Sequence, residues 1–379
     1  MPRSPSFRLE AVDPATGARA GVLATPHGEV PTPLFLPVGT RGTVKGIRPE
    51  ELAAVGARML LANTYHLHLR PGEEVVASLG GLHALMGWEG PILTDSGGYQ
   101  VFSLSHLTAI DEEGATLRSV VDGRPIRLTP ESVVLIQRTL GADVIMALDH
   151  CPADPTDRRG VAEATERTHR WLDRGARAWR AGGGGEAGPA LFGIVQGGVF
   201  PDLRRASAAA VVAHDLPGYA IGGVSTGEDR AARLAALDAV LPLLPPDRPR
   251  YLMGVGTPLD FVEAVLRGVD MFDCVTPTRH GRNHQAFTPE GRINLRNHRW
   301  RRDPGPLDPG CDCPCCRRFS RGALRHLATS GEMLAGILLS LHNLRFFLRL
   351  LEEVRAAIVA GDLSPVLARV RRPEMGMGS

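Results

Sequence analysis

Short apolar runs rich in β-branched residues recur along the chain, and each of them ends in polar residues or glycine. Most are followed by a stretch with the apolar periodicity of a helix. The runs span residues 33–38, 59–64, 91–95, 143–149, 190–196, 219–224, 251–255 and 269–275. Eight strand–helix units within about 250 residues predict an α/β fold, the (β/α)8 TIM barrel. A doubly wound open sheet is the alternative, which the number of successive units disfavours.

Polar residues and glycines stand at the ends of these runs. They are Asp95, Asp149, Gln196, Gly222, Gly223 and Asp273. Because the C-terminal ends of all barrel strands meet at one mouth, three carboxylates, an amide and two glycines are expected to lie together. A single aspartate at a strand end is more often a turn residue or a helix cap. The convergence of three favours a functional site.

Four of the six cysteines lie within six residues of one another. They are Cys311, Cys313, Cys315 and Cys316. His342 follows in a strongly helical stretch. Thiolates this close together, with a distant imidazole to complete a tetrahedron, are typical of a structural Zn²⁺. Disulfide bonds are the alternative, but the crowding disfavours them, and Cys151 and Cys274 stand alone.

Composition places the chain among proteins with one large core. Its 379 residues are 43% hydrophobic, enough for a core and an appendage. No uninterrupted run of 18 apolar residues occurs, and the N-terminus lacks the apolar segment of a signal peptide. We therefore expect a cytoplasmic protein with reduced thiols and no membrane partner.

Charge is nearly balanced overall but uneven along the chain. The formal net charge is +2, which identifies no partner. Residues 279–325 contain eleven arginines and four acidic residues, a net charge of +7. Such a segment fits contacts to phosphate groups. A solvated surface around a metal loop is the alternative.

Other motifs give weaker signals. The glycines at 182–185 are followed by Glu186 rather than by lysine and a hydroxyl, so no phosphate-binding loop is expected. The sequence GVG at 254–256 lacks the third glycine of a dinucleotide fingerprint. His66 and His68, two apart on an expected strand, are interpreted as packing residues rather than metal ligands.

With these residues identified, the chain resembles the bacterial tRNA-guanine transglycosylases, also called queuine tRNA-ribosyltransferases. The resemblance covers nearly the whole chain, and the segment at 95–104 and the cysteine loop are its most specific parts. The matching segments are FLPVGT at 35–40, NTYHL at 63–67, DSGGYQVFSL at 95–104, GIVQGG at 193–198, YAIGG at 219–223, MGVGT at 253–257, MFDCV at 271–275, the cysteine loop and 331–345. The family fold is a zinc-bearing (β/α)8 barrel, which agrees with the count of runs.

The resemblance implies that guanine at the wobble position of tRNAs with GUN anticodons is replaced by a 7-deazaguanine. Asp273 matches the family nucleophile, which holds the ribose as a covalent ester while the bases are exchanged. Asp95 matches the general acid/base. A carboxylate suits the role of nucleophile, as in retaining glycosidases, because it can attack an oxocarbenium-like carbon and leave again.

The other family positions are carried over in the same way. Groups that read the purine match Ser96, Asp149, Gln196, Gly223 and Val224, and Tyr99 and Met253 match the residues that sandwich the base. Arg279 and Arg282 match the anticodon-contacting segment. The ligands of one structural Zn²⁺ per chain match Cys311, Cys313, Cys316 and His342, which leaves Cys315 as the odd thiol.

The expected organisation is a barrel with an N-terminal lead-in at 1–275, an inserted zinc-binding and tRNA-contacting subdomain at 276–345, and a C-terminal helix packing on the barrel at 346–379. The family also implies a homodimer. Its partners would be tRNAs of the Asp, Asn, His and Tyr type and the incoming 7-deazaguanine base.

Some positions depart from the family pattern. Residues 279–285 read RHGRNHQ rather than an RNARNG-like sequence. Thr226 stands where bacterial members usually carry valine, whereas Cys151 is the bacterial type and favours 7-aminomethyl-7-deazaguanine. After the last helix we expect none of the added RNA-binding domains of archaeal relatives, which argues against the archaeosine pathway.

Three alternative functions follow from these features. One is a transglycosylase that uses queuine, and another is a non-catalytic tRNA-binding subunit, against which Asp95 and Asp273 argue. A glycoside hydrolase is disfavoured, because only 5% of residues are aromatic and the tryptophans lie away from the strand ends.

Overall fold

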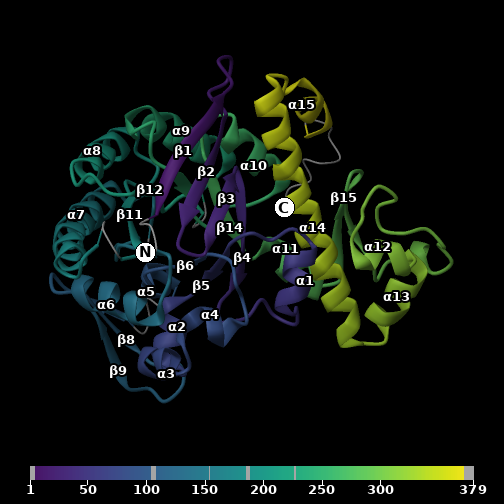
Figure 1. Cartoon of the computed structure of the whole chain (residues 1–379), viewed down its shortest axis with the longest axis horizontal. Helices are drawn as coiled ribbons and strands as arrows, with labels where there is room; N and C mark the ends of the chain where they lie inside the picture. Colours follow the sequence, from purple (N-terminus) through teal and green to yellow (C-terminus); the bar gives the residue numbers. More distant parts are fainter. Residues whose placement is uncertain (1–4, 104–107, 153, 185–187, 226–227, 371–379) are drawn as a thin grey trace.

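Eight parallel strands form a closed barrel in chain order. The computed structural model describes residues 5–103, 108–152, 154–184, 188–225 and 228–370. The barrel strands are β4 (Leu34–Gly39), β5 (Leu60–Ala62), β6 (Ile92–Thr94), β10 (Val144–Met146), β11 (Ala190–Val195), β12 (Gly218–Ile221), β13 (Arg250–Leu252) and β14 (Met271–Cys274). The barrel closes where β14 pairs with β4 (Figure 1). The predicted TIM barrel is confirmed, and each strand lies at one of the eight predicted runs.

Helices surround the barrel, mostly between successive strands (Figure 1). They are α1 (Pro49–Ala54), α2 (Thr64–Leu69), α3 (Glu73–Ser78), α4 (Gly81–Met86), α5 (Gly98–Ser103), α6 (Pro130–Leu140), α7 (Arg158–Ala181), α8 (Pro201–Val212), α9 (Arg230–Val240) and α10 (Pro258–Val265). The strand expected at 59–64 is shorter than predicted. His66 and His68 therefore lie on α2, not on a strand, because Asn63 caps a helix by accepting the backbone N–H of His66.

An antiparallel sheet covers the N-terminal end of the barrel. It consists of β1 (Ser6–Val12), β2 (Arg19–Thr25) and β3 (Gly28–Thr32). Leu23 and Val30 from this sheet join the apolar cluster that fills the barrel interior. Arg19 forms a buried ion pair with Asp270, at 3.1 Å, just before β14. The lead-in thus closes the end of the barrel opposite to the strand C-termini.

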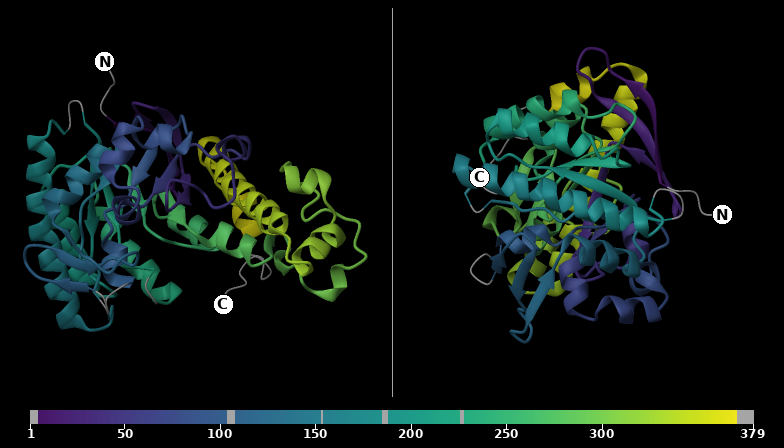
Figure 2. Two further views of the ribbon diagram at one scale, coloured as in Figure 1. Left: turned by 90° about the horizontal axis from the view of Figure 1, so that it is seen from below. Right: turned by 90° about the vertical axis from the view of Figure 1, so that its left-hand side faces the viewer.

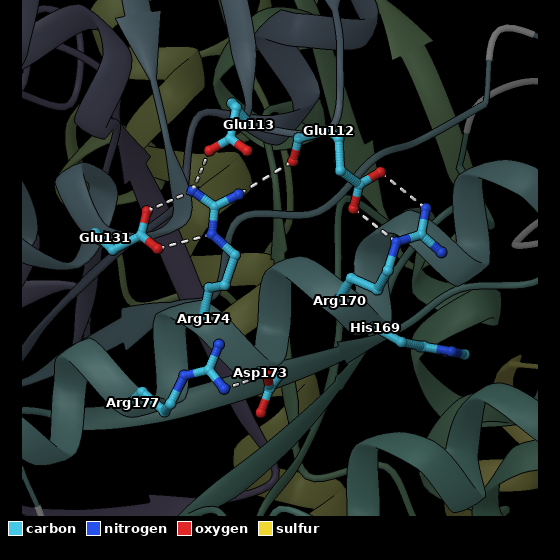
Figure 3. A pocket seen from close by; sticks show the side chains of 8 residues that line it. All are labelled: Glu112, Glu113, Glu131, His169, Arg170, Asp173, Arg174 and Arg177. Atoms are coloured by element: carbon cyan, nitrogen blue, oxygen red, sulfur yellow. Dashed lines mark hydrogen bonds and ion pairs between the residues drawn. The ribbon is translucent and has the colours of Figure 1, made fainter.

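A second small sheet, which the apolar pattern did not predict, follows α5. Its strands are β7 (Thr108–Ile110), β8 (Ala115–Arg118) and β9 (Pro125–Leu128). Figure 3 shows how ion pairs hold the β7–β8 turn against α7. Arg170 pairs with both oxygens of Glu112, at 2.6 and 2.9 Å, and Arg174 pairs with Glu113 of the turn, at 3.2 Å, and with Glu131 of α6. These groups are largely exposed, so each pair contributes little to stability.

The C-terminal part comprises α11 (Thr276–Arg282), β15 (Gln285–Thr288), β16 (Gly291–Asn294), α12 (Pro314–Arg318), α13 (Arg321–Thr329), α14 (Met333–Ala360) and α15 (Ser364–Val370). It begins on the barrel, and the region of α12 and α13 extends away from it, whereas α14 and α15 pack back on the barrel (Figure 2). By length and composition α14 could cross a membrane, but 78% of its most apolar window is buried inside the fold. It also runs without a break through residues 345 and 346. The division at 1–275, 276–345 and 346–379 stays a prediction.

Candidate active site and metal centre

A cavity of about 430 Å³ opens at the C-terminal end of the barrel. This volume suits a small aromatic ligand. Nine of the predicted site residues line the cavity, namely Asp95, Ser96, Tyr99, Asp149, Gln196, Gly223, Met253, Asp273 and Arg279. Val224 is buried and does not line it, and neither does Arg282, which is exposed at the end of α11. Thr226 lies outside the described residues.

Asp273 is held in the barrel wall by two donors. The Tyr251 hydroxyl donates to its Oδ1 at 2.5 Å, and the Gly254 backbone N–H donates to the same oxygen at 2.8 Å. Burial raises the pKa of Asp273, although both hydrogen bonds act in the opposite direction. The carboxylate is therefore fixed in orientation, with Oδ2 left to face a ligand.

Asp95 lies at the end of β6 and has a different environment. Its Oδ1 accepts the backbone N–H of Thr64 at 3.0 Å, and its Oδ2 accepts the amide of Asn63. Burial raises the pKa of Asp95 to about 7, and the nearby charge of Asp273 adds to the shift. At neutral pH this carboxyl group can either donate or accept a proton, as a general acid/base must.

A polar network fills the side of the cavity formed by β6, β10 and β11. The Gln196 amide nitrogen donates to Asp149 Oδ2 at 2.6 Å, and the Ser96 hydroxyl donates to Asp149 Oδ1 at 3.4 Å. Burial raises the pKa of Asp149 to about 6. Gln196 Oε1 is buried and accepts no hydrogen bond from the residues that the structure describes. A buried carboxylate and a free amide oxygen together suit the N–H groups of a planar base.

Glycines bring the backbone close to this network. A Cβ on Gly98 would lie 2.1 Å from Asp149 Oδ1. A Cβ on Gly223 would lie 2.3 Å from Gln196 Oε1, and its φ of +59° also favours glycine. Neither position tolerates a side chain without moving a polar group of the cavity.

Several residues that support the site were not identified from the sequence. Asn63 and Gly254 lie in family segments but had no assigned role, and Tyr251 begins an expected strand. Arg204 on α8 is fully buried and donates to the carbonyl oxygens of Gly222 and Gly223, the first at 2.7 Å. It fixes the loop after β12, yet nothing in the sequence distinguishes it from other arginines.

Arg279 and Arg282 lie one helical turn apart on α11, and both are exposed. The helix packs closely on α14, because Gly281 lacks the Cβ that would lie 2.5 Å from the backbone of Ser340. Asn343 on α14 also donates to Pro277 O at 2.9 Å. The long helix thus sets the position of two cations at and beside the cavity mouth.

The predicted metal ligands form one compact cluster. Ligand atoms of Cys311, Cys313, Cys316 and His342 lie within 4.8 Å of one another. His342 Nε2 donates to Phe287 O at 2.7 Å, so its Nδ1 carries the lone pair and faces the sulfurs, with Cys316 Sγ at 3.2 Å. Three thiols and an imidazole fit a closed structural Zn²⁺ site. Cys315 is fully buried and lies outside the cluster.

We expect purified protein to contain one zinc ion per chain and Cys313→Ser to lose it. Because the loss of a structural metal belongs to the changes that cost more than about 4 kcal/mol, the melting temperature should fall clearly. Elemental analysis and thermal unfolding measure both effects. Cys315→Ala is the matched control and should keep its zinc. Equal zinc contents in Cys313→Ser and the wild type, or no zinc in the wild type, would contradict the assignment.

Comparison with known proteins identifies the family. The family model described as queuine tRNA-ribosyltransferase matches residues 13–374. A protein of that name from Thermus thermophilus is 55% identical over 368 residues, which cover 96% of this chain and 94% of the relative. The one from Herpetosiphon aurantiacus is 54% identical over 342 residues, which cover 90% of this chain and 86% of the relative. The one from Pelotomaculum thermopropionicum is 52% identical over 358 residues, which cover 94% of this chain and 95% of the relative. The resemblance inferred from the motifs is confirmed, and the chain belongs to the queuine tRNA-ribosyltransferase family.

Proposed function

We propose that this protein is a tRNA-guanine transglycosylase, which exchanges the wobble guanine of tRNAs with GUN anticodons for 7-aminomethyl-7-deazaguanine. The observation that carries the proposal is the pair Asp95 and Asp273, which line one cavity in a chain that is 55% identical to a named queuine tRNA-ribosyltransferase. The two carboxyl groups accept hydrogen bonds from different donors, and a nucleophile and an acid/base need such different surroundings.

The reaction is a double displacement. An Asp273 oxygen attacks C1′ of the ribose while the bond from C1′ to N9 of guanine breaks, and Asp95 gives its proton to the departing base. The incoming base then loses its N9 proton to Asp95, and its N9 attacks C1′ and displaces the Asp273 oxygen. Two displacements preserve the anomeric configuration. Tyr251 and Gly254 hold the nucleophile in place during both steps.

The base would be read by the network on the opposite wall. Asp149 and the free Gln196 Oε1 accept its N–H groups, Ser96 and the backbone around Gly223 add further polar contacts, and Tyr99 and Met253 enclose its faces. A base without matching donors would leave Gln196 Oε1 and Asp149 unsatisfied, which costs binding energy. Val224 would contribute through its backbone, since its side chain is buried.

The anticodon loop would bind across the mouth of the cavity. Arg279 and Arg282 are exposed beside it, and seven further exposed arginines follow between residues 292 and 318. Three aspartates of that segment pair with arginines: Asp303 with Arg321, Asp308 with Arg349 and Asp312 with Arg345. The exposed positive charge therefore stays available for phosphate groups and for stacking on unpaired bases.

Three further properties belong to the proposal on family grounds. The substrates would be the Asp, Asn, His and Tyr tRNAs, the active form a homodimer, and the location the cytoplasm. The choice between queuine and 7-aminomethyl-7-deazaguanine depends on the space around Cys151, which lines the cavity. Burial raises the pKa of this thiol to about 12, so it stays uncharged at neutral pH.

Incorporation of radiolabelled guanine into unmodified tRNA-Tyr tests the function. The wild type should label the tRNA, and Asp273→Asn should lose at least about a thousandfold in rate, because the amide cannot form the ester. In denaturing gels only the wild type should carry covalently bound tRNA, whereas both proteins should bind tRNA under native conditions.

The control for this assay is Asp122→Asn, which changes an exposed aspartate of the β8–β9 turn and should keep full activity. The stronger competitor among 7-aminomethyl-7-deazaguanine and queuine identifies the incoming base. A folded, zinc-loaded wild type that labels no tRNA would favour the non-catalytic subunit instead.

The dependence of kcat/KM for tRNA on pH should report Asp95. The first displacement needs this group protonated, so the rate should fall about tenfold per pH unit above its pKa of about 7. At low pH protonation of Asp273, whose pKa is also raised, should lower the rate again. Residual activity of Asp95→Asn should lack the alkaline limb. An unchanged limb in that variant would assign it to another group.

A further inference from the structure

A second group of metal-ligating side chains lies at the other end of the barrel from the cavity. Three segments that are distant in sequence bring it together: the β2–β3 turn carries His27, α4 carries His83, and Asp143 precedes β10. One nitrogen of each imidazole and a carboxylate oxygen lie within 4.8 Å of one another. The proposed transglycosylase chemistry gives these residues no role.

The carboxylate of this group is firmly held. Asp143 is almost fully buried, and its Oδ2 accepts the backbone N–H of Ile92 at 2.8 Å. His27 Nδ1 lies 2.7 Å from Oδ1, and His83 Nε2 lies 3.1 Å from Oδ2. The two imidazole rings stack with their centroids 3.6 Å apart. Both rings therefore aim a nitrogen at the same carboxylate from one side.

The chemistry of this group suits a cation. Two imidazole nitrogens and a carboxylate oxygen are ligands that Zn²⁺ binds readily. Because Asp143 also accepts the backbone N–H of Ile92, a ligating carboxylate would be held in orientation by a hydrogen bond from outside the site.

We propose that His27, His83 and Asp143 bind a divalent first-row transition ion, Zn²⁺ in the first place, which fastens the β2–β3 hairpin to the barrel. Tetrahedral ligand atoms at about 2.0–2.1 Å from zinc lie roughly 3.3 Å apart. The distance of 2.7 Å between His27 Nδ1 and Asp143 Oδ1 must therefore increase slightly when the ion binds. His27 can supply this movement, because it lies in a turn and its side chain is 40% exposed. Water would complete the coordination.

The bound ion would stabilise the packing of the N-terminal sheet on the end of the barrel. Leu23 and Val30 of the N-terminal sheet pack on the barrel interior, and the turn between their strands carries His27. A metal ion would join this turn to α4 and to the start of β10. Since the three ligands come together only in the folded chain, binding stabilises that state in proportion to the logarithm of the free zinc concentration.

The test uses full-length protein that already holds zinc in its cysteine cluster. After equilibration with buffered Zn²⁺ and removal of free metal, elemental analysis should find two zinc ions per wild-type chain and one in His27→Gln and in His83→Gln. The melting temperature of the wild type should rise with free Zn²⁺, whereas that of both variants should not respond. Co²⁺ added to wild type that holds zinc only in its cysteine cluster should give visible bands without the thiolate charge-transfer bands.

The matched control is His68→Gln. His68 Nδ1 also lies 2.7 Å from a carboxylate, that of Glu73, but this pair joins α2 to α3 and lies outside the cluster. The variant should keep two zinc ions and the zinc-dependent melting temperature. Circular dichroism establishes that each variant is folded.

Two results would overturn the proposal. One is a wild type that holds one zinc ion per chain and has a melting temperature indifferent to free Zn²⁺, in which case the three residues form only a hydrogen-bonded clasp. The other is a second zinc ion that persists in both folded histidine variants, which would place the ion elsewhere. Neither result depends on transglycosylase activity, because the readouts are metal content and thermal stability.

Discussion

The site depends on one constraint, the burial of two carboxyl groups in the same cavity. Removing an ionised carboxylate from water costs several kcal/mol unless donors replace the water. Asp273 receives the Tyr251 hydroxyl and the Gly254 N–H, and Asp95 receives donors from Thr64 and Asn63. Burial and the nearby charge of Asp273 together raise the pKa of Asp95 to about 7, so this carboxyl group titrates near neutral pH. The barrel supplies this arrangement, since each donor comes from the neighbouring strand or from the residues just after it.

The long helix α14 connects the parts that must keep their positions around that cavity. His342 contributes to the metal cluster, Asn343 holds α11, and Arg349 pairs with Asp308 of the cysteine loop at 2.7 Å. Near its other end Arg355 donates to Gly21 O and Thr32 O of the N-terminal sheet. The zinc cluster therefore supports the basic helix α11 through α14 rather than by touching the cavity. The apolar residues of α14 pack in the core, which explains why a helix long enough to span a membrane is buried inside the fold.

The sequence predicted those features that repeat or that depend on local spacing. Eight apolar runs were enough to predict the barrel, and strand ends were enough to bring Asp95, Asp149 and Asp273 together. The β7–β9 sheet was missed because its short strands alternate polar and apolar residues without a continuous run. Arg204 was missed because its role depends on carbonyl oxygens that the fold brings to it. The roles assigned to individual residues came from family resemblance and remain predictions.

The buried carboxyl groups at the two ends of the barrel differ in their effect on the stability of the fold. At the C-terminal end, burial that raises the pKa of Asp95 and Asp149 costs stability at neutral pH, since the folded protein binds protons that the unfolded chain releases. At the N-terminal end, burial raises the pKa of Asp270 to about 6 despite its ion pair with Arg19, whereas Asp143 keeps a lowered pKa between two histidines. That carboxylate favours the folded state at the same pH, because its charged form finds its partners only there. Asp143 lies 60 residues after His83 and 116 residues after His27, so this group could be found only in the folded structure. The favourable contribution of Asp143 thus opposes the cost of burying Asp95 and Asp149 at the other end, without contact between them.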